Sequence, residues 1–403
     1  MDDKPMLRSG PIRYAEAERF APPRPPSAGG ARPPGGRICP QPPSRLDAVM
    51  GPPHDRRPQS EDCLHLTVTT PARDDGARPV LVWLHGGGFS SGGGVLDWYD
   101  GGALAAEGDA VVVGVNYRLG ALGYLVLDGV SDGNLGLLDQ LEALRWVRDH
   151  IADWGGDPGD VTVFGQSAGA LSIRLLMAVP EADGLFRRAL LQSAPLPIAA
   201  RPHQQARDIG RMFADHLGCD PRTATPEALL AAQGRTAADH QRRSGSALEP
   251  PFTPVTGTAP LAAPEPGLTA RAGELDVMYG WNAEDMSAFP PLPGETGTVA
   301  ERTRQVYGTP LAHFGGQLRR AGARVHAYRL DWRPAGSPLG ATHCVELPLL
   351  LGSRDAWRGA PMLGETAWED VDSFGRAVRA CWLAFARTGD PGALPAPLVS
   401  VSP

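Results

Sequence analysis

One strand-turn-helix segment constrains the fold of this chain more than any other feature. Val161-Thr-Val-Phe164 favours a strand, and Ala170-Leu-Ser-Ile-Arg-Leu-Leu-Met177 favours a helix. Between them, Gly165-Gln-Ser-Ala-Gly169 matches the G-x-S-x-G pattern of a sharp strand-to-helix turn. Both glycines are needed there, because a Cβ at either position would collide with the neighbouring chain. The pattern predicts that the turn exposes the Ser167 hydroxyl and leaves the Ala168 amide at a helix N-terminus.

A serine in this position is a candidate nucleophile, with the adjacent amide directed at developing negative charge. The alternative is a turn of small residues without a chemical role. The strand before the turn and the helix after it favour the chemical interpretation.

Strands and helices alternate along most of the chain. Apolar residues recur at helical spacing between Leu135 and Ile151, which predicts a helix. A final helix is expected over Phe374–Phe385 and should end at Gly389. Strands are expected at Cys63–Thr69, Val80–Leu84, Ala110–Val115, Arg188–Gln192, Leu275–Tyr279 and Arg324–Leu330. This alternation predicts an α/β fold with a mostly parallel central sheet flanked by helices.

We expect one domain over residues 1–403. Within it, residues 1–60 form a Pro/Gly-rich irregular segment, and cap-like or irregular insertions are expected at about 220–270 and 287–310.

Composition excludes several classes of function. The formal net charge is -7 over 403 residues, which argues against a nucleic-acid or anionic-membrane surface. No apolar run reaches the length of a membrane span, and the first residues lack a signal-peptide pattern, so a cytoplasmic location is expected. Five scattered cysteines do not form a disulfide scaffold. Lys4 is the single lysine, which, with abundant Ala, Gly and Pro, indicates a GC-rich bacterial genome.

A glycine turn directly follows the Val80–Leu84 strand. In His85-Gly-Gly-Gly-Phe89, successive backbone N–H groups can line one concave patch, because no side chain intervenes. Such a patch stabilises the oxyanion of an acyl-transfer intermediate. A phosphate-binding loop is the competing interpretation, but the turn lacks the G-K-[ST] ending and the spacing of a dinucleotide fingerprint.

A serine nucleophile needs a base and an orienting carboxylate, and the chain order expected for this fold is Ser, acid, His. Of the histidines after the later strands, His313 falls in a helix-like segment and His326 within a strand. His343 lies on a Gly-containing loop, where a base is wanted. For the acid, Glu284 and Asp285 both follow the Leu275–Tyr279 strand, and either could reach the imidazole.

Together these segments resemble the type B carboxylesterase family, the para-nitrobenzyl-esterase and cholinesterase-like branch of the α/β-hydrolases. The resemblance extends over most of residues 10–390. Its motifs are Pro11–Ala15, Glu18–Phe20, Ser60–Leu64, His85–Phe89, Tyr99–Gly101, Asn116–Gly120, Gly133–Leu137, Asp139–Gln140, Gly155–Pro158, Gly165–Gly169 and Gly389–Pro391.

The resemblance implies an α/β-hydrolase fold and assigns roles to matching residues. Ser167 is the nucleophile, His343 the base and Asp285 the acid, although the family usually has Glu there and Glu284 is the alternative acid. The amides of Gly87, Gly88 and Ala168 form the oxyanion hole. Other matching positions are Ser193, a serine near the acid; the ion pairs Arg19–Glu61 and Arg118–Asp139; and Cys39 with Cys63, a possible disulfide that a cytoplasmic location disfavours.

The chain also departs from the family pattern. The opening strands and the closing strand are expected to be missing, and the short Pro290–Gly294 link replaces a helical subdomain. Gln166 stands where a glutamate is often found, which should leave the site less negative. With this reduced cap, the resemblance predicts a shallow, open site that accepts varied acyl and alcohol groups. Phe89, Met286 and Phe289 are candidate lining residues, although each could equally belong to the core.

The expected function is therefore a serine carboxylic-ester hydrolase that acts on small-molecule esters through an acyl-enzyme, with no cofactor and no metal. The alternatives are an inactive or non-catalytic paralogue of the same fold, and an amidase or carbamate hydrolase with the same triad.

Overall fold

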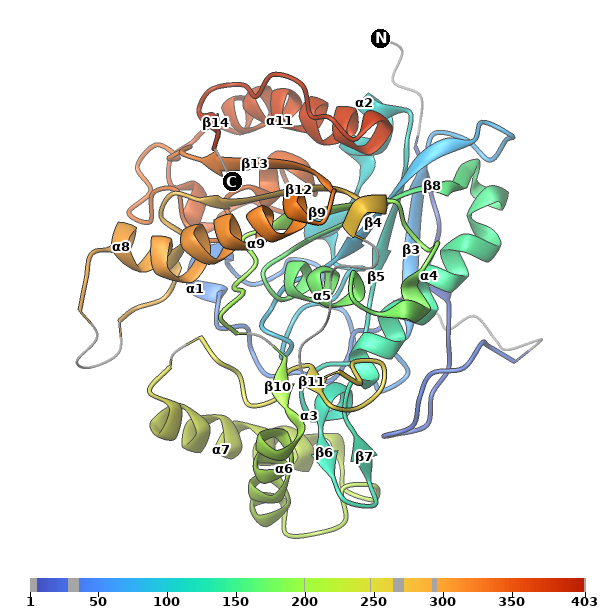
Figure 1. Cartoon of the computed structure of the whole chain (residues 1–403), viewed down its shortest axis with the longest axis vertical. Helices are drawn as coiled ribbons and strands as arrows, with labels where there is room; N and C mark the ends of the chain where they lie inside the picture. Colours follow the sequence, from blue (N-terminus) through green and yellow to red (C-terminus); the bar gives the residue numbers. More distant parts are fainter. Residues whose placement is uncertain are drawn as a thin grey trace.

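A ten-stranded sheet forms the centre of the computed structural model, which describes residues 6–27, 36–198, 200–246, 248–263, 272–291 and 296–401 (Figure 1). In spatial order its main path runs through β1 (Leu7–Arg8), β3 (His65–Thr70), β5 (Val111–Val115), β4 (Arg78–Leu84), β8 (Gly156–Gln166), β9 (Arg188–Gln192), β12 (Asp276–Asn282), β13 (Arg324–Leu330) and β14 (Leu398–Ser400), and β2 (Ile12–Arg13) also pairs with β3. The strands from β5 to β13 along this path are parallel, and β3 and β14 flank them antiparallel. The mostly parallel sheet expected from the sequence is confirmed.

The strand β4 is buried on both faces. Val80, Val82 and Leu84 belong to one hydrophobic cluster, and Leu81 and Trp83 belong to the other. Side chains alternate between the two faces of a strand, so each face of the sheet needs its own apolar cover. This explains why the β4 sequence is continuously apolar rather than alternating.

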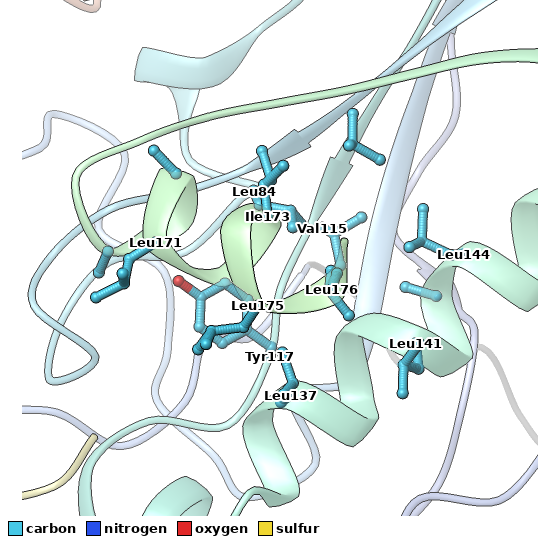
Figure 2. Packing of buried hydrophobic residues seen from close by; sticks show 14 of the residues in the cluster. Leu84, Val115, Tyr117, Leu137, Leu141, Leu144, Leu171, Ile173, Leu175 and Leu176 are labelled. Carbon is cyan, nitrogen blue, oxygen red and sulfur yellow. The ribbon is translucent and has the colours of Figure 1, made fainter. Parts of the chain in front are cut away.

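Helices provide that cover on both faces (Figure 1). One face carries α4 (Leu135–His150), α5 (Ala168–Leu176) and α9 (Thr309–Arg320), and the other carries α2 (Gly102–Gly108), α10 (Leu347–Leu350) and α11 (Trp368–Thr388). Figure 2 shows leucines of α4 and α5 packed together with Leu84 and Val115 of the sheet. The strand-helix alternation in the sequence therefore produces three layers.

A smaller lobe lies below the sheet in Figure 1. It contains α3 (Gly120–Tyr124), α6 (His203–Leu217), α7 (Pro226–Ser244) and two small sheets, β6 (Val126–Leu127) with β7 (Ser131–Asp132) and β10 (Arg201–Pro202) with β11 (Val255–Thr256). The insertion expected at about 220–270 is thus largely helical in its first half. Thr225 caps α7, since its side chain accepts a hydrogen bond from the Ala228 N–H.

The insertion expected at 287–310 also contains helix. A capping box between Thr298 and Glu301 starts α8 (Val299–Thr303), and a π-helical turn, Arg304–Gly308, joins it to α9. In the N-terminal segment, α1 (Asp47–Met50) is a single helical turn. The described residues leave out 28–35, 264–271 and 292–295 of these expected segments. Residues 292–294 of the Pro290–Gly294 link are therefore also outside the described residues.

The expectation that the opening and closing strands are missing is wrong. The short strands β1 and β2 both pair antiparallel with β3, and β14 pairs antiparallel with β13. Strands of two or three residues are too short to show periodicity, so the sequence pattern does not predict them.

Both expected ion pairs are present. Arg118 and Asp139 are buried, with Nη2 and Oδ1 2.7 Å apart, and Arg19 Nε lies 2.8 Å from Glu61 Oε2. Among the described residues, no helix combines the length and apolar character needed to cross a membrane.

Candidate active site

The strand-to-helix turn has the geometry that the sequence predicts. β8 ends at Gln166, α5 begins at Ala168, and Ser167 between them has φ 56° and ψ -120°. A Cβ on Gly169 would lie 2.0 Å from the Leu84 carbonyl oxygen, and one on Gly165 would lie 2.6 Å from the same atom. The turn therefore packs directly on the end of β4, and only glycine fits at these two positions.

His343 and Asp285 form a buried pair. Nδ1 of His343 lies 2.7 Å from Oδ1 of Asp285, and both side chains are 0% exposed. A carboxylate accepts hydrogen bonds, so Nδ1 carries the proton and Nε2 of the neutral ring is left as an acceptor. This is the tautomer that a general base needs.

Asp285 is held in place by two further donors. The Ser193 hydroxyl donates to Oδ2 at 3.0 Å, and the Asn282 backbone N–H donates to the same oxygen at 2.8 Å. Ser193 directly follows β9 and Asn282 ends β12, so two adjacent parallel strands deliver these donors to one sheet edge. The family resemblance predicts Ser193 near the acid, whereas the contact from Asn282 was not predicted.

Glu284, the alternative acid, points elsewhere. Its carboxylate accepts a hydrogen bond from the Ala341 N–H at 2.9 Å and pairs with Nε of Arg333 at 2.9 Å. Its backbone N–H also donates to the Ala341 carbonyl. Glu284 thus ties the loop that carries His343 to the loop that carries Asp285, and the structure brings Asp285 rather than Glu284 to the imidazole.

Nε2 of His343 lies against the nucleophile turn. The side-chain amide nitrogen of Gln166, the residue immediately before Ser167, is 2.9 Å from Nε2. The rings of Phe289 and Tyr307 flank the imidazole, with centroids at 5.3 and 5.6 Å. From the sequence, Gln166 was expected only to make the site less negative, whereas its amide contacts the imidazole directly.

The glycine turn after β4 lies beside Ser167. His85 is buried and stacks on Tyr117 with ring centroids 4.3 Å apart, and its Nδ1 contacts the Gly86 carbonyl at 2.7 Å. Burial lowers the His85 pKa to about 4, so the ring is neutral at physiological pH. Gly87 has φ +109°, and a Cβ there would lie 2.0 Å from the Ser91 carbonyl oxygen. The tight turn thus depends on glycine.

A pocket of about 530 Å³, partly open to solvent, joins these elements. Ser167 lines it together with Gly87, Gly88 and Ala168, the residues expected to form an oxyanion hole. Of the expected lining residues, Phe89 and Phe289 face the pocket, but Met286 is buried in the core instead.

Two further lining residues, Arg45 and Tyr307, were not found from the sequence. Arg45 lies in the Pro-rich N-terminal segment, and Tyr307 lies on the π-helical turn before α9. Neither segment has a periodic pattern that predicts where its side chains point. Only the tertiary structure shows that their side chains line the pocket.

Cys39 and Cys63 are buried free thiols. The structure thus lacks the disulfide that the family resemblance raised as possible, although the hydrogen bond between the two side chains contributes to a raised pKa of Cys63. In the part of the chain that the structure describes, no three His, Cys, Asp or Glu side chains are grouped as a metal site.

Glu346 is a second buried carboxylate near the His343–Asp285 pair. Glu346 is 1% exposed and accepts a hydrogen bond from the Asn282 side-chain amide at 2.6 Å. Burial, and secondarily the charge of Asp285, raises its pKa from 4.5 to about 7. Glu346 follows His343 by three residues, a spacing that could have drawn attention to it in the sequence.

We expect Glu346 to make stability depend on pH. Because its pKa is higher in the folded state, the folded chain binds more protons than the unfolded chain between the two values, and stability falls as pH rises from 4.5 to about 7. The loss is about 3 kcal/mol. Glu346→Gln removes this ionisation. The unfolding free energy of the variant minus that of wild type should therefore be about 3 kcal/mol larger at pH 8 than at pH 4. Urea unfolding at both pH values measures it, and an equal difference at both would contradict the assignment.

Known proteins resemble this chain over most of its length. The model of the carboxylesterase family matches residues 10–305. Probable N-octanoylanthranilate hydrolase of Rhodococcus erythropolis is 43% identical over 403 aligned residues, covering 94% of this chain and 88% of the relative. Para-nitrobenzyl esterase of Bacillus subtilis is 32% identical, covering 88% of this chain and 79% of the relative.

Solved structures agree as well. A structure of PNB esterase superposes with a TM-score of 0.83 at 28% identity, covering 99% of this chain and 90% of that one. Carboxylesterase EST55 of Geobacillus stearothermophilus at pH 6.2 gives a TM-score of 0.79 at 29% identity, with 99% and 91% covered. The fold is that of an α/β-hydrolase, and this chain belongs to the carboxylesterase family.

Proposed function

We propose that Ser167, His343 and Asp285 are the catalytic triad of this carboxylic ester hydrolase. The observation that carries the proposal is the position of the His343 imidazole. Nδ1 contacts Asp285 at 2.7 Å, and Nε2 lies at the turn that holds Ser167, beside a pocket lined by Gly87 and Gly88.

In this mechanism the Ser167 hydroxyl attacks the ester carbonyl carbon while Nε2 of His343 takes its proton. The Gly87, Gly88 and Ala168 amides stabilise the negative charge that forms on the carbonyl oxygen. The imidazolium then donates the proton to the departing alcohol, which leaves an acyl group on Ser167. Water, deprotonated by His343, releases the acid and restores the serine. Asp285 holds the required tautomer and stabilises the imidazolium, and Ser193 and Asn282 orient Asp285.

Two observations support a medium-length acyl chain as part of the substrate. The pocket wall next to Ser167 is apolar, with Leu171, Pro195, Ile198 and Phe289 facing the hollow. The name of the Rhodococcus relative specifies an octanoyl group. We propose that the acyl chain lies along this wall. Broad tolerance of acyl and alcohol groups stays a prediction.

An active-site label tests the proposal. A fluorophosphonate should modify the folded protein at one site, which peptide mapping identifies as Ser167, and the modification should abolish hydrolysis of para-nitrophenyl hexanoate. Protein unfolded in urea before labelling is the control and should not react, because the nucleophile depends on the folded triad. Labelling at a different serine, or hydrolysis that survives complete labelling, would overturn the assignment.

A further inference from the structure

Asn282 contacts both loops that carry the acid and the base. Its backbone N–H donates to Oδ2 of Asp285 at 2.8 Å. Its side-chain amide donates to the Thr342 carbonyl at 2.8 Å and to Oε2 of Glu346 at 2.6 Å. These two acceptors lie on either side of His343 in the chain. One residue therefore links the loop of the acid to the loop of the base.

The side-chain contacts require asparagine, whereas the backbone contact does not. Every residue except proline would present the same N–H to Asp285. A primary amide carries two hydrogens on one nitrogen, and Nδ2 of Asn282 directs them at two acceptors. An ionised aspartate has no hydrogen to donate, and threonine has one. The residue type at this position is thus explained by the loop of the base and not by the acid.

Asn282 makes these contacts from a rigid part of the sheet. It is the last residue of β12, which is paired with β9 on one side and β13 on the other, and it is 1% exposed. Groups on such a strand are held more precisely than groups on a loop. The Glu284 contacts described above hold the loop of the base at Ala341, before His343. The Asn282 contacts hold it on both sides of the imidazole.

Glu346 orients the Asn282 amide. Its Oε2 accepts the bond from Asn282, and its Oε1 lies 3.5 Å from Nε2 of Gln192. A buried carboxylate costs free energy unless hydrogen bonds satisfy it, so its presence here calls for an explanation. A carboxylate oxygen is a strong acceptor, which fixes one hydrogen of the amide and leaves the other aimed at Thr342.

We propose that the side-chain amide of Asn282 positions the catalytic base. It holds the Thr342–Glu346 segment where the imidazole of His343 reaches both of its triad partners. The inference rests on the proposed triad and adds a positioning residue that acts through the base. A displacement of about 1 Å between reacting groups can lower a rate about 100-fold. Loss of the amide should therefore lower kcat, while binding in the pocket changes little.

The test uses Asn282→Leu alone and combined with Glu346→Met, assayed with para-nitrophenyl hexanoate at pH 8. Leucine keeps the backbone N–H and nearly the volume of asparagine, but it leaves Glu346 without its closest donor. The melting temperature of the single variant should therefore fall. In the double variant both side chains are apolar, so the melting temperature should recover. In both variants kcat should fall about 100-fold, with KM within about threefold of wild type.

Asn134→Gly is the matched control. Asn134 is a buried asparagine whose amide donates to the Val255 carbonyl of β11 in the smaller lobe, and glycine tolerates its φ of 58°. This variant should lose stability but keep kcat within about threefold of wild type. The proton between His343 and Asp285 gives a second readout, because a short hydrogen bond moves its NMR signal far downfield. The signal should match wild type in Asn134→Gly, and should shift or disappear in the double variant.

The outcomes separate this inference from the proposed triad. Recovery of kcat together with the melting temperature in the double variant would show that Asn282 serves stability alone, and would overturn the inference. A loss confined to KM, or an unchanged proton signal in the double variant, would overturn it as well. Failure of wild type to hydrolyse para-nitrophenyl hexanoate, or to be labelled at Ser167, would instead count against the proposed function.

Discussion

Replacing Ser167 with alanine is expected to lower kcat for para-nitrophenyl hexanoate at least about 10⁴-fold. The loss is large because no other group can form the acyl-enzyme, while the pocket and the glycine turn still bind the substrate. Initial rates at saturating ester measure it. The matched control is Ser373→Ala, which removes an exposed serine of α11 and should retain the wild-type rate. A Ser167→Ala protein that melts like wild type and keeps more than about 1% of its kcat would rule out the nucleophile.

The backbone conformation of Ser167 allows a second, independent test at this position. With φ 56° and ψ -120°, Ser167 has a conformation that costs a residue with a Cβ free energy and costs glycine little. We expect Ser167→Gly to be inactive like the alanine variant, but more stable than it by about 1 kcal/mol in urea unfolding. A glycine variant less stable than the alanine variant would contradict strain at this turn.

Asp285→Asn is expected to lower kcat by about 10³ to 10⁴-fold. Asparagine nearly preserves the shape of the side chain, but it can present an N–H to Nδ1 and so stabilise the wrong tautomer, and it no longer balances the charge of the imidazolium. Since Ser193 and the Asn282 N–H both donate to Oδ2, the amide oxygen should settle there, which leaves the NH₂ group facing His343. The decrease should appear in kcat more than in KM.

Glu284→Gln is the matched control at the neighbouring position. A glutamine oxygen can still accept the Ala341 N–H, and the ion pair that is lost involves an exposed Arg333. Such pairs contribute little to stability. The variant should therefore keep its kcat within about tenfold of wild type. If Glu284→Gln lost as much activity as Asp285→Asn, or more, the acid would have to be reassigned.

Much of the fold could be predicted from the chain alone. β9 and β13 have the bounds expected from their apolar patterns, and α4 and α5 differ by only a few residues. These elements are long and buried, so periodicity identifies them. The two-residue strands β1 and β2 escaped prediction because their pairing with β3 depends on the sheet and not on local sequence.

The sequence by itself determined the sharp turn at Ser167. The glycines on either side of Ser167 and the strand before it permit hardly any geometry except a sharp turn into a helix. All of these residues are close together in the chain, so the local sequence is sufficient. Only the tertiary structure shows which of Glu284 and Asp285 contacts the imidazole, because adjacent residues in a chain can point in opposite directions. It also decided the place of Arg45, since an irregular segment takes its path from the surface on which it packs.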